Sequence, residues 1–302
     1  MDQNLTTVHA SRREAWPAFA ALVAGAMAMG ISPIFVRWAD VGPFTSAFWR
    51  VFLALPALYI WMRLSDRGLD RAETAKASFS TPILLAGLAF TGDLLFWHLS
   101  IRTTSVANAT FFATTAPIWV IVFGWLLFRE QVGRETLAAL AFCLLGGGAL
   151  LGESLRVRPT EAVGDLEGLA TGVFFGLYFL AVQAARRHAS AARVTFESTV
   201  LTAAALFVIA AAAERQMLPN TLVGALALFA MAWISHAGGQ GLLAVALGRL
   251  PATFSSLVIF LEAIAAAAFA FALLGEPVSR VQSLGGLLII AGIYVARPRS
   301  KG

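Results

Sequence analysis

The sequence predicts an all-α integral membrane protein, with ten transmembrane helices arranged as two inverted five-helix repeats and both termini in the cytoplasm. Composition points to this fold class first. Hydrophobic residues make up 59% and charged residues 13% of the 302 residues, and the mean hydropathy is +0.77. In a typical soluble domain about a quarter of the residues are charged. The low charged fraction of this chain therefore favours a protein surrounded by lipid. The second observation is a series of long apolar runs, and the third is an internal repeat.

The apolar runs follow one another with short loops between them. A hydrocarbon core of about 30 Å requires roughly 20 apolar residues per helix. The runs are continuous, not alternating, and are rich in Ala, Leu, Phe and Gly, so they fit helices and not barrel strands. The predicted helices cover residues 16–38, 44–62, 80–100, 106–127, 135–151, 164–184, 195–213, 222–247, 253–273 and 281–296.

The first run has some features of a signal peptide, because Arg12 and Arg13 precede it and small residues lie within it. Its length favours a membrane span, since apolar character continues to Val36. The repeat described next also requires this run as the partner of 164–184. We therefore expect it to be the first span.

The internal repeat is clearest at two glutamates, Glu130 and Glu276, which end the fourth and ninth runs and lie 146 positions apart. The same offset pairs further residues: Leu127 with Leu273, Val132 with Val278, Arg134 with Arg280, Phe123 with Phe269, Ile118 with Ile264, Gly146 with Gly292, and Gly30 with Gly176. One offset near half the chain length indicates a duplication.

The duplication divides the chain into 16–151 as the first five-helix repeat and 164–296 as the second. An extracytoplasmic connector is predicted at 152–163, and cytoplasmic tails at 1–15 and 297–302. Because five is an odd number, the second repeat enters the membrane in the opposite direction. Inverted repeats of this kind frame a substrate site near the bilayer midplane in many transporters.

Orientation follows from the positions of Lys and Arg. With the N-terminus in the cytoplasm, fifteen of these residues fall on the cytoplasmic side and five on the other. The positive-inside rule therefore predicts that both termini are cytoplasmic, in a multi-pass protein of the cytoplasmic (inner) membrane. The net charge of +5 is explained by this asymmetry, so no nucleic-acid partner is required; lipid is the expected surrounding.

Ionisable residues within spans are costly and are functional candidates by default. In this chain they are Arg50, Asp93, His98, His236 and Glu262. Helical spacing places polar and aromatic neighbours beside them or on facing helices. These neighbours are Phe90 and Trp97 in span three, Asn108, Phe111 and Thr115 in span four, Phe174 and Tyr178 in span six, and Trp233 and Gln240 in span eight. A cavity between such helices combines aromatic walls with a few hydrogen-bonding groups.

Structural roles remain open for the same residues. Trp97 is also suited to a lipid-facing belt, and His236 and Gln240 to bonds between neighbouring helices. Asp93 also fits an ion pair with Arg50 or His98. For Arg50, Glu130 and Glu276 a structural or gating role is favoured over contact with substrate. The single cysteine, Cys143, lies within a span, which excludes a disulfide and a thiolate metal cluster.

Three segments resemble a known family. They are "IRTTSVANATFFATTAPIWVIVFGWLLFREQV" (Ile101 to Val132), its weaker copy "LGRLPATFSSLVIFLEAIAAAAFAFALLGEPV" (Leu247 to Val278), and "FWRVFLA" (Phe48 to Ala54). They look like the EamA repeats of the drug/metabolite transporter superfamily, and the resemblance covers essentially the whole chain. The family's usual Glu-Pro pair is divided here, since Pro117 lacks a preceding Glu and Glu262 is followed by Ala263. The resemblance implies a ten-helix exporter of small metabolites, most similar to YddG-type exporters of aromatic amino acids.

Two other classes of function fit the sequence less well than transport. An integral-membrane enzyme acting on lipid-linked substrate requires a cluster of histidines and carboxylates, whereas the four histidines are scattered at positions 9, 98, 188 and 236. No metal or other cofactor and no catalytic residue is therefore expected. A membrane scaffold requires more exposed surface than these short loops provide. Transport is favoured, by a chain that we expect to be a monomer.

The substrate is inferred from the residues available inside the spans. Polyanions are disfavoured because no Lys lies inside a span. Abundant aromatics favour aromatic and other neutral amino acids, and export of cationic drugs or other small metabolites through Glu262 or Asp93 is the alternative. We expect the substrate side chain to contact Trp97, Trp233, Phe111, Phe174 and Tyr178, and its polar ends to contact Asn108, His236 and Gln240. Both facilitated diffusion and proton exchange through Asp93, Glu262 or a histidine remain possible modes.

Overall fold

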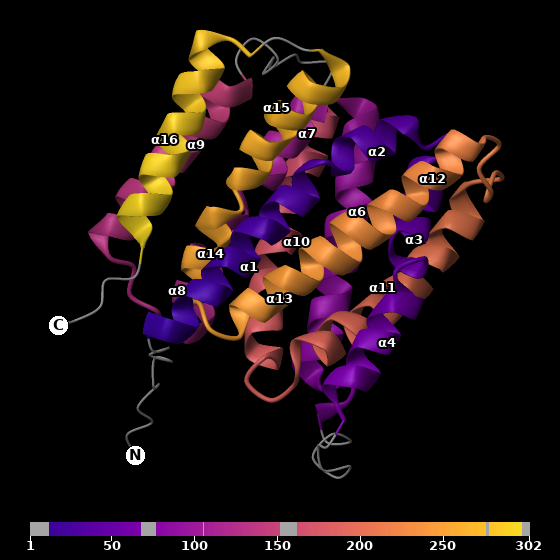
Figure 1. Cartoon of the computed structure of the whole chain (residues 1–302), viewed down its shortest axis with the longest axis horizontal. Helices are drawn as coiled ribbons and strands as arrows, with labels where there is room; N and C mark the ends of the chain where they lie inside the picture. The colour runs from indigo at the N-terminus through magenta and orange to yellow at the C-terminus, as the bar shows by residue number, and fades with distance from the viewer. Residues whose placement is uncertain (1–11, 68–76, 105, 152–161, 276–277, 298–302) are drawn as a thin grey trace.

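The computed structural model describes residues 12–67, 77–104, 106–151, 162–275 and 278–297. Within these ranges all regular structure is helical, which confirms the predicted all-α class. Figure 1 shows a bundle with both termini at the same end. The helices are α1 (Arg12–Gly30), α2 (Ser32–Trp38), α3 (Pro43–Phe52), α4 (Leu55–Ser65), α6 (Thr81–Thr103), α7 (Val106–Ala113), α8 (Ala116–Phe128), α9 (Arg134–Leu151), α10 (Ala162–Ala185), α11 (Ala191–Ala213), α12 (Leu222–Ala230), η3 (Met231–Gln240), α13 (Gly241–Leu247), α14 (Ala252–Val258), α15 (Leu261–Leu274) and α16 (Arg280–Ala296).

Nine helical segments of the described chain are long and apolar enough to cross a membrane. They are Trp16–Trp38, Pro43–Ser65, Thr81–Thr103, Asn108–Phe128, Arg134–Leu151, Ala162–Ala185, Ala191–Ala213, Leu222–Leu247 and Ala252–Leu273. The tenth predicted helix forms α16, an apolar helix of 17 residues that is shorter than the other nine.

Three spans of the first repeat are interrupted, and each new segment carries proline in its first turn. Pro33 begins α2, Pro56 begins α4 and Pro117 begins α8. Proline has no amide hydrogen, and its ring clashes with the preceding helical turn, so it is tolerated at a helix start and breaks a helix interior. The sequence therefore explains why spans one, two and four are each built from two helices.

Two spans of the second repeat depart from regular α-helix without proline at the departure. Span nine is interrupted between Val258 and Leu261, where the Glu262 N–H donates to the Ile259 carbonyl at 2.8 Å. Span eight contains the π-helix η3, Met231–Gln240. Such π segments are rare in proteins and are frequent at functional sites. Five of the spans thus have an irregular middle.

Gly30 and Gly176, which the repeat offset pairs, make equivalent contacts. A Cβ atom on Gly30 would lie 2.6 Å from the Cβ of Ala265, and one on Gly176 would lie 2.7 Å from the Cβ of Trp119. Ala265 and Trp119 are themselves 146 positions apart. The first span of each repeat therefore packs on the fourth span of the other in the same register, which supports the duplication.

The fifth spans of the two repeats, α9 and α16, pack along each other at one edge of the bundle (Figure 1). The Cys143 thiol lies 3.9 Å from the carbonyl oxygen of Ile289, 146 positions away. The neighbouring glycines are again symmetric: a Cβ on Gly146 would lie 2.6 Å from the Gly285 oxygen, and one on Gly292 2.8 Å from the Ala139 oxygen. Contact between a residue and its own repeat mate places α9 and α16 on a pseudo-two-fold axis.

The second spans of the two repeats are tied together at both ends. The Glu214 carboxylate, at the end of α11, accepts hydrogen bonds from the backbone N–H groups of Phe44 and Thr45, each at 3.0 Å. It thereby caps α3, whose first N–H groups have no partner within the helix. At the other end, Arg193 pairs with Asp66 at 2.5 Å and with Glu197 at 2.7 Å. The α3–α4 span and α11 are therefore connected at both ends.

Glu130 is exposed just beyond α8. Arg129 has a left-handed backbone, with φ of 54°, and the Glu130 N–H donates to the Gly124 carbonyl at 3.2 Å. This pattern closes a helix by satisfying its last carbonyl groups. The mate of Arg129 is Gly275, which also has positive φ, at 69°. Glu130 is thus part of a helix stop at the surface; Glu276 lies outside the described residues.

Candidate functional site

The irregular segments surround one small space, the central cavity. Its volume is about 40 Å³, enough for about three water molecules at roughly 10–15 Å³ each. Residues of seven spans contribute to its wall. They are Met29, Ser32, Arg50, Asp93, Leu94, Trp97, Thr110, Ala113, Thr114, Thr171, Phe175, Gln240, Ile259 and Glu262.

Three charged residues face this cavity from different helices: Arg50 of α3, Asp93 of α6 and Glu262 of α15. The guanidinium group interacts electrostatically with both carboxylates. None of the three side chains forms an ion pair or hydrogen bond with a described residue. Arg50 and Asp93 are only 5% and 7% exposed. Charged groups buried within a membrane without partners are costly, so this arrangement favours binding of a charged ligand or water between them.

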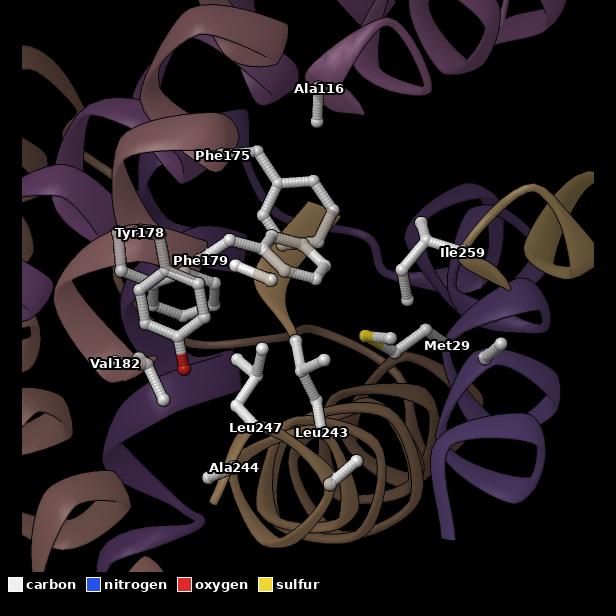
Figure 2. Packing of buried hydrophobic residues seen from close by; sticks show 14 of the residues in the cluster. Met29, Ala116, Phe175, Tyr178, Phe179, Val182, Leu243, Ala244, Leu247 and Ile259 are labelled. Atoms are coloured by element: carbon white, nitrogen blue, oxygen red, sulfur yellow. The ribbon is translucent and has the colours of Figure 1, made fainter. Parts of the chain in front are cut away.

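The rest of the wall is aromatic, aliphatic and weakly polar. The Arg50 guanidinium lies over the Trp97 ring, with 5.7 Å between the guanidinium carbon and the ring centre. Figure 2 shows Phe175 of α10, Met29 of α1 and Ile259, which lies in the break between α14 and α15, directed toward one another. The cavity therefore has a charged side and an apolar side, which suits a ligand with both kinds of surface.

The cavity is closed toward the end of the bundle where both termini lie. Leu243 and Leu247 of α13 pack there against Phe179 and Val182 of α10 (Figure 2), and all four side chains are at most 2% exposed. This apolar layer begins one turn beyond Gln240 and extends to the ends of both helices. Passage of a polar solute in this direction requires separation of α10 and α13.

Four of the predicted binding residues line the cavity: Asp93, Trp97, Gln240 and Glu262. Arg50, predicted as structural or gating, lines it as well. Three more predicted residues form a buried layer just outside it. The Phe90 ring lies 4.8 Å from that of Tyr178 and 5.3 Å from that of His236, and the His236 Nε2 lies 2.9 Å from the Thr199 hydroxyl.

The remaining predicted binding residues lie away from the cavity. The Asn108 amide donates to Asp165 at 3.0 Å, and the Thr115 hydroxyl donates to the Phe112 carbonyl at 2.6 Å. Phe111 packs near Phe112, Phe174 stacks on Phe96, and His98 lines a different pocket. Trp233 is 54% exposed, and its indole N–H donates to the Leu53 carbonyl at 3.1 Å.

Small polar residues of the wall were missed by the sequence reasoning. Ser32, Thr110, Thr114 and Thr171 all line the cavity. A signal for two of them was present, because Ser32 precedes Pro33 and Thr114 precedes the interruption that Pro117 makes. Irregular backbone at membrane depth is tolerated where it borders a cavity, so proline within an apolar run points to nearby residues as wall.

A larger pocket, the vestibule, opens at the opposite end of the bundle from the termini. Its volume is about 580 Å³. Its wall consists of Val36, Val41, Gly42, Pro43, Ser46, His98, Ile101, Arg102, Glu214, Arg215 and Gln216. Within the described chain, no group of three or more His, Cys, Asp or Glu side chains is placed to hold a metal ion.

Comparison with known proteins supports the two-repeat organisation of the chain. The sequence pattern of the EamA-like transporter family matches residues 16–151 and again 162–297. Two proteins of Archaeoglobus fulgidus, each named an uncharacterized transporter, are 26% and 25% identical to this chain. Their alignments span 296 and 272 residues, which cover 92% and 85% of this chain and 95% and 88% of theirs.

One solved crystal structure superposes with a TM-score of 0.79 and 17% identity, over 95% of this chain and 97% of its own. At this identity the likeness concerns the fold alone. The sequence and fold comparisons both extend over nearly the whole length of the chain.

Proposed function

The chain belongs to the EamA-like transporter family, and we propose that it exports aromatic and other neutral amino acids by alternating access through the central cavity. The observation that carries this proposal is the set of unpaired charges in that cavity. One cation and two carboxylates stand beside an apolar wall without direct contact between them. An amino-acid zwitterion has the complementary groups: a carboxylate, an ammonium group and a side chain.

Each part of such a substrate has a partner in the cavity. Arg50 binds the carboxylate, because guanidinium and carboxylate form strong charge-assisted hydrogen bonds. Asp93 and Glu262 accept from the ammonium group. Trp97 and Phe175 contact an aromatic or aliphatic side chain. This assignment keeps the predicted contact of Trp97, and Phe175 takes the place of the predicted contacts of Trp233, Phe111 and Phe174.

The cavity has a volume of about 40 Å³, which is smaller than the roughly 300–1,000 Å³ common for pockets that hold small ligands. Substrate binding therefore requires the helices around it to move apart. The interruptions at Pro33 and Pro117 and the break before Leu261 provide positions where half-helices can change angle. Alternating access is the rocking of these segments about the cavity.

A second candidate function is export of cationic drugs or other small metabolites. The observation that favours it is the excess of carboxylates, because Asp93 and Glu262 face a single Arg50. A cationic solute satisfies the unbalanced negative charge without a carboxylate of its own. The two candidates differ in whether Arg50 contacts the solute.

We also propose that the protein is a monomer of the inner membrane with both termini in the cytoplasm. The fifteen-to-five distribution of Lys and Arg supports this orientation. It places the vestibule at the extracytoplasmic surface. A single chain that contains both repeats encloses the central cavity by itself, which supports a monomer.

The test uses purified protein in liposomes loaded with unlabelled solutes, with protein-free vesicles as the control. Uptake of labelled phenylalanine, a cationic dye and a labelled nucleotide sugar is measured in parallel. We expect phenylalanine uptake that other apolar amino acids compete with and that Arg50→Gln abolishes. Dye uptake without phenylalanine uptake contradicts the proposal and supports the second candidate.

A further inference from the structure

The vestibule lies one helical turn beyond the central cavity on the same three helices. On each of α2, α3 and α6, a residue that lines the cavity is four positions from a residue that lines the vestibule. These pairs are Ser32 and Val36, Arg50 and Ser46, and Trp97 and Ile101. Four residues span about 6 Å along a helix. The partition between the two spaces is therefore a single turn thick.

Four buried polar atoms of these helices lack a hydrogen-bond partner among the described residues: Ser32 Oγ, Ser46 Oγ, Arg50 Nε and His98 Nε2. Their side chains are between 1% and 5% exposed. Each residue lines either the cavity or the vestibule, so the unpartnered atoms lie along the partition. A buried polar atom without a partner costs free energy. Such atoms are explained if a polar solute or water contacts them in another step of the transport cycle.

The hydrogen bond of the His98 Nδ1 atom determines whether the Nε2 atom donates or accepts a hydrogen bond. Its Nδ1 lies 2.8 Å from the Leu94 carbonyl oxygen, which can only accept a hydrogen bond. The Nδ1 atom therefore carries the hydrogen, and in the neutral ring Nε2 is an acceptor. A group that donates a hydrogen bond, such as an ammonium group or water, is its complement.

The rim of the vestibule is positively charged. Arg102 and Arg215 line it and are exposed, and neither guanidinium has an ion-pair partner within the described chain. Glu214 also lines the vestibule, and both of its oxygens accept from α3 backbone groups. The remaining wall is largely apolar, with Val36 and Ile101 among its residues. The volume, about 580 Å³, is within the range of sites for small ligands.

We propose that the vestibule is a second, exit-side binding site for solutes that carry a carboxylate beside an apolar group. Arg102 and Arg215 bind the carboxylate there, and Val36 and Ile101 contact the apolar part. The solute reaches this site from the central cavity through the partition, where Ser46 and His98 provide temporary hydrogen bonds. The proposal rests on the proposed transport function, but its binding chemistry is testable without transport.

The test introduces one cysteine into the vestibule and measures its reaction rate with a neutral thiol reagent. Cys143 is the single cysteine and is buried, so Cys143→Ala provides a background for Val36→Cys. Two probes of similar shape are compared: phenylacetate, which carries a carboxylate, and phenethylamine, which does not. At twice its Kd, phenylacetate should slow the reaction about threefold by occupancy, and phenethylamine should not.

The double variant R102Q/R215Q should abolish the protection by phenylacetate. Arg280→Gln is the matched control, because Arg280 is also exposed and lies outside the vestibule; it should leave the protection intact. Equal protection by the two probes, or protection that survives in R102Q/R215Q, overturns the vestibule site. Protection without phenylalanine transport in liposomes leaves the vestibule site standing and contradicts only the proposed substrate.

Discussion

The guanidinium carbon of Arg50 lies 5.7 Å from the centre of the Trp97 ring, and neither side chain hydrogen-bonds to a described residue. A cation over an aromatic face is stabilised without losing its capacity to donate hydrogen bonds. Arg50 is thus held in place by α6 and keeps its donors for a ligand. The first prediction concerns this pair.

Trp97→Ala should weaken phenylalanine binding about tenfold. The substitution removes an aromatic wall and the cation–π support of Arg50, together on the order of 1–2 kcal/mol. Trp233→Ala is the matched control, since Trp233 is also a span tryptophan but is 54% exposed and outside the cavity. Equilibrium binding of labelled phenylalanine to purified protein measures both effects. An equal loss of phenylalanine affinity in the two variants would indicate that Trp233 also contacts the substrate.

Neutralising a cavity carboxylate should also weaken binding of the substrate ammonium group. Asp93→Asn and Glu262→Gln each remove one charged hydrogen-bond acceptor, worth roughly 1.5–3 kcal/mol. We expect the phenylalanine Kd to rise by about ten- to a hundredfold. Glu130→Gln removes an exposed carboxylate at a helix end and should leave the Kd unchanged. A Kd that none of the three variants changes excludes contact between the cavity carboxylates and the ammonium group.

The same variants distinguish the two modes of energy coupling. Proton exchange through Asp93 or Glu262 requires a carboxylate that can gain and lose a proton. In liposomes with a pH gradient, and with phenylalanine above its raised Kd, D93N/E262Q should then carry phenylalanine only down its own gradient. Uphill flux that persists in this double variant rules out coupling through these two residues.

Gly30→Ala and Gly176→Ala should both destabilise the protein, by about 1–3 kcal/mol. The new methyl groups would lie within 2.6 and 2.7 Å of Ala265 and Trp119 on the facing helices. Gly148→Ala is the control, because a Cβ atom there meets nothing within 4 Å and alanine favours helix by about 0.5–1 kcal/mol. Thermal unfolding in detergent should show a lowered midpoint for Gly30→Ala and for Gly176→Ala, and an unchanged or raised midpoint for Gly148→Ala. A symmetric response is expected because the two contacts are repeat mates.

Glu214→Ala should lower the unfolding midpoint by the loss of the α3 cap, on the order of 1–2 kcal/mol. Glu214→Gln keeps one acceptor oxygen and should lose less. The difference between the two variants measures the one hydrogen bond to Phe44 or Thr45 that the Gln oxygen retains. If Glu214→Ala is as stable as the wild-type protein, the Glu214 hydrogen bonds to Phe44 and Thr45 contribute nothing measurable to stability.

The positions of the spans could be predicted from the sequence because an apolar run of about 20 residues is a strong signal that neighbouring context does not reverse. The interruptions within the spans were harder to predict from the sequence. Pro33, Pro56 and Pro117 indicate three of them, whereas the break before Leu261 and the π-helix Met231–Gln240 occur without proline. There the departure depends on packing, which local sequence does not encode.

The charged residues of the site could be predicted from the sequence for a physical reason. A carboxylate such as Asp93 or Glu262 raises the free energy of a membrane-spanning helix whichever side of the helix it lies on. Its presence in a span therefore indicates a functional site. An aromatic residue has no such cost in lipid. Phe174 and Phe175 are adjacent in the sequence, yet only Phe175 lines the cavity, and helical spacing shows which residues share a face without showing which face points inward.

The lengths of α9 and α16 have a consequence for the surrounding bilayer. At 18 and 17 residues they extend about 26–27 Å, which is less than the roughly 30 Å of a typical hydrocarbon core. Because both lie at one edge of the bundle (Figure 1), the lipid must thin or polar flanking groups must reach outward on that side only, at a fraction of a kcal/mol per Å. Shorter lipids should therefore favour whichever conformation exposes that edge most.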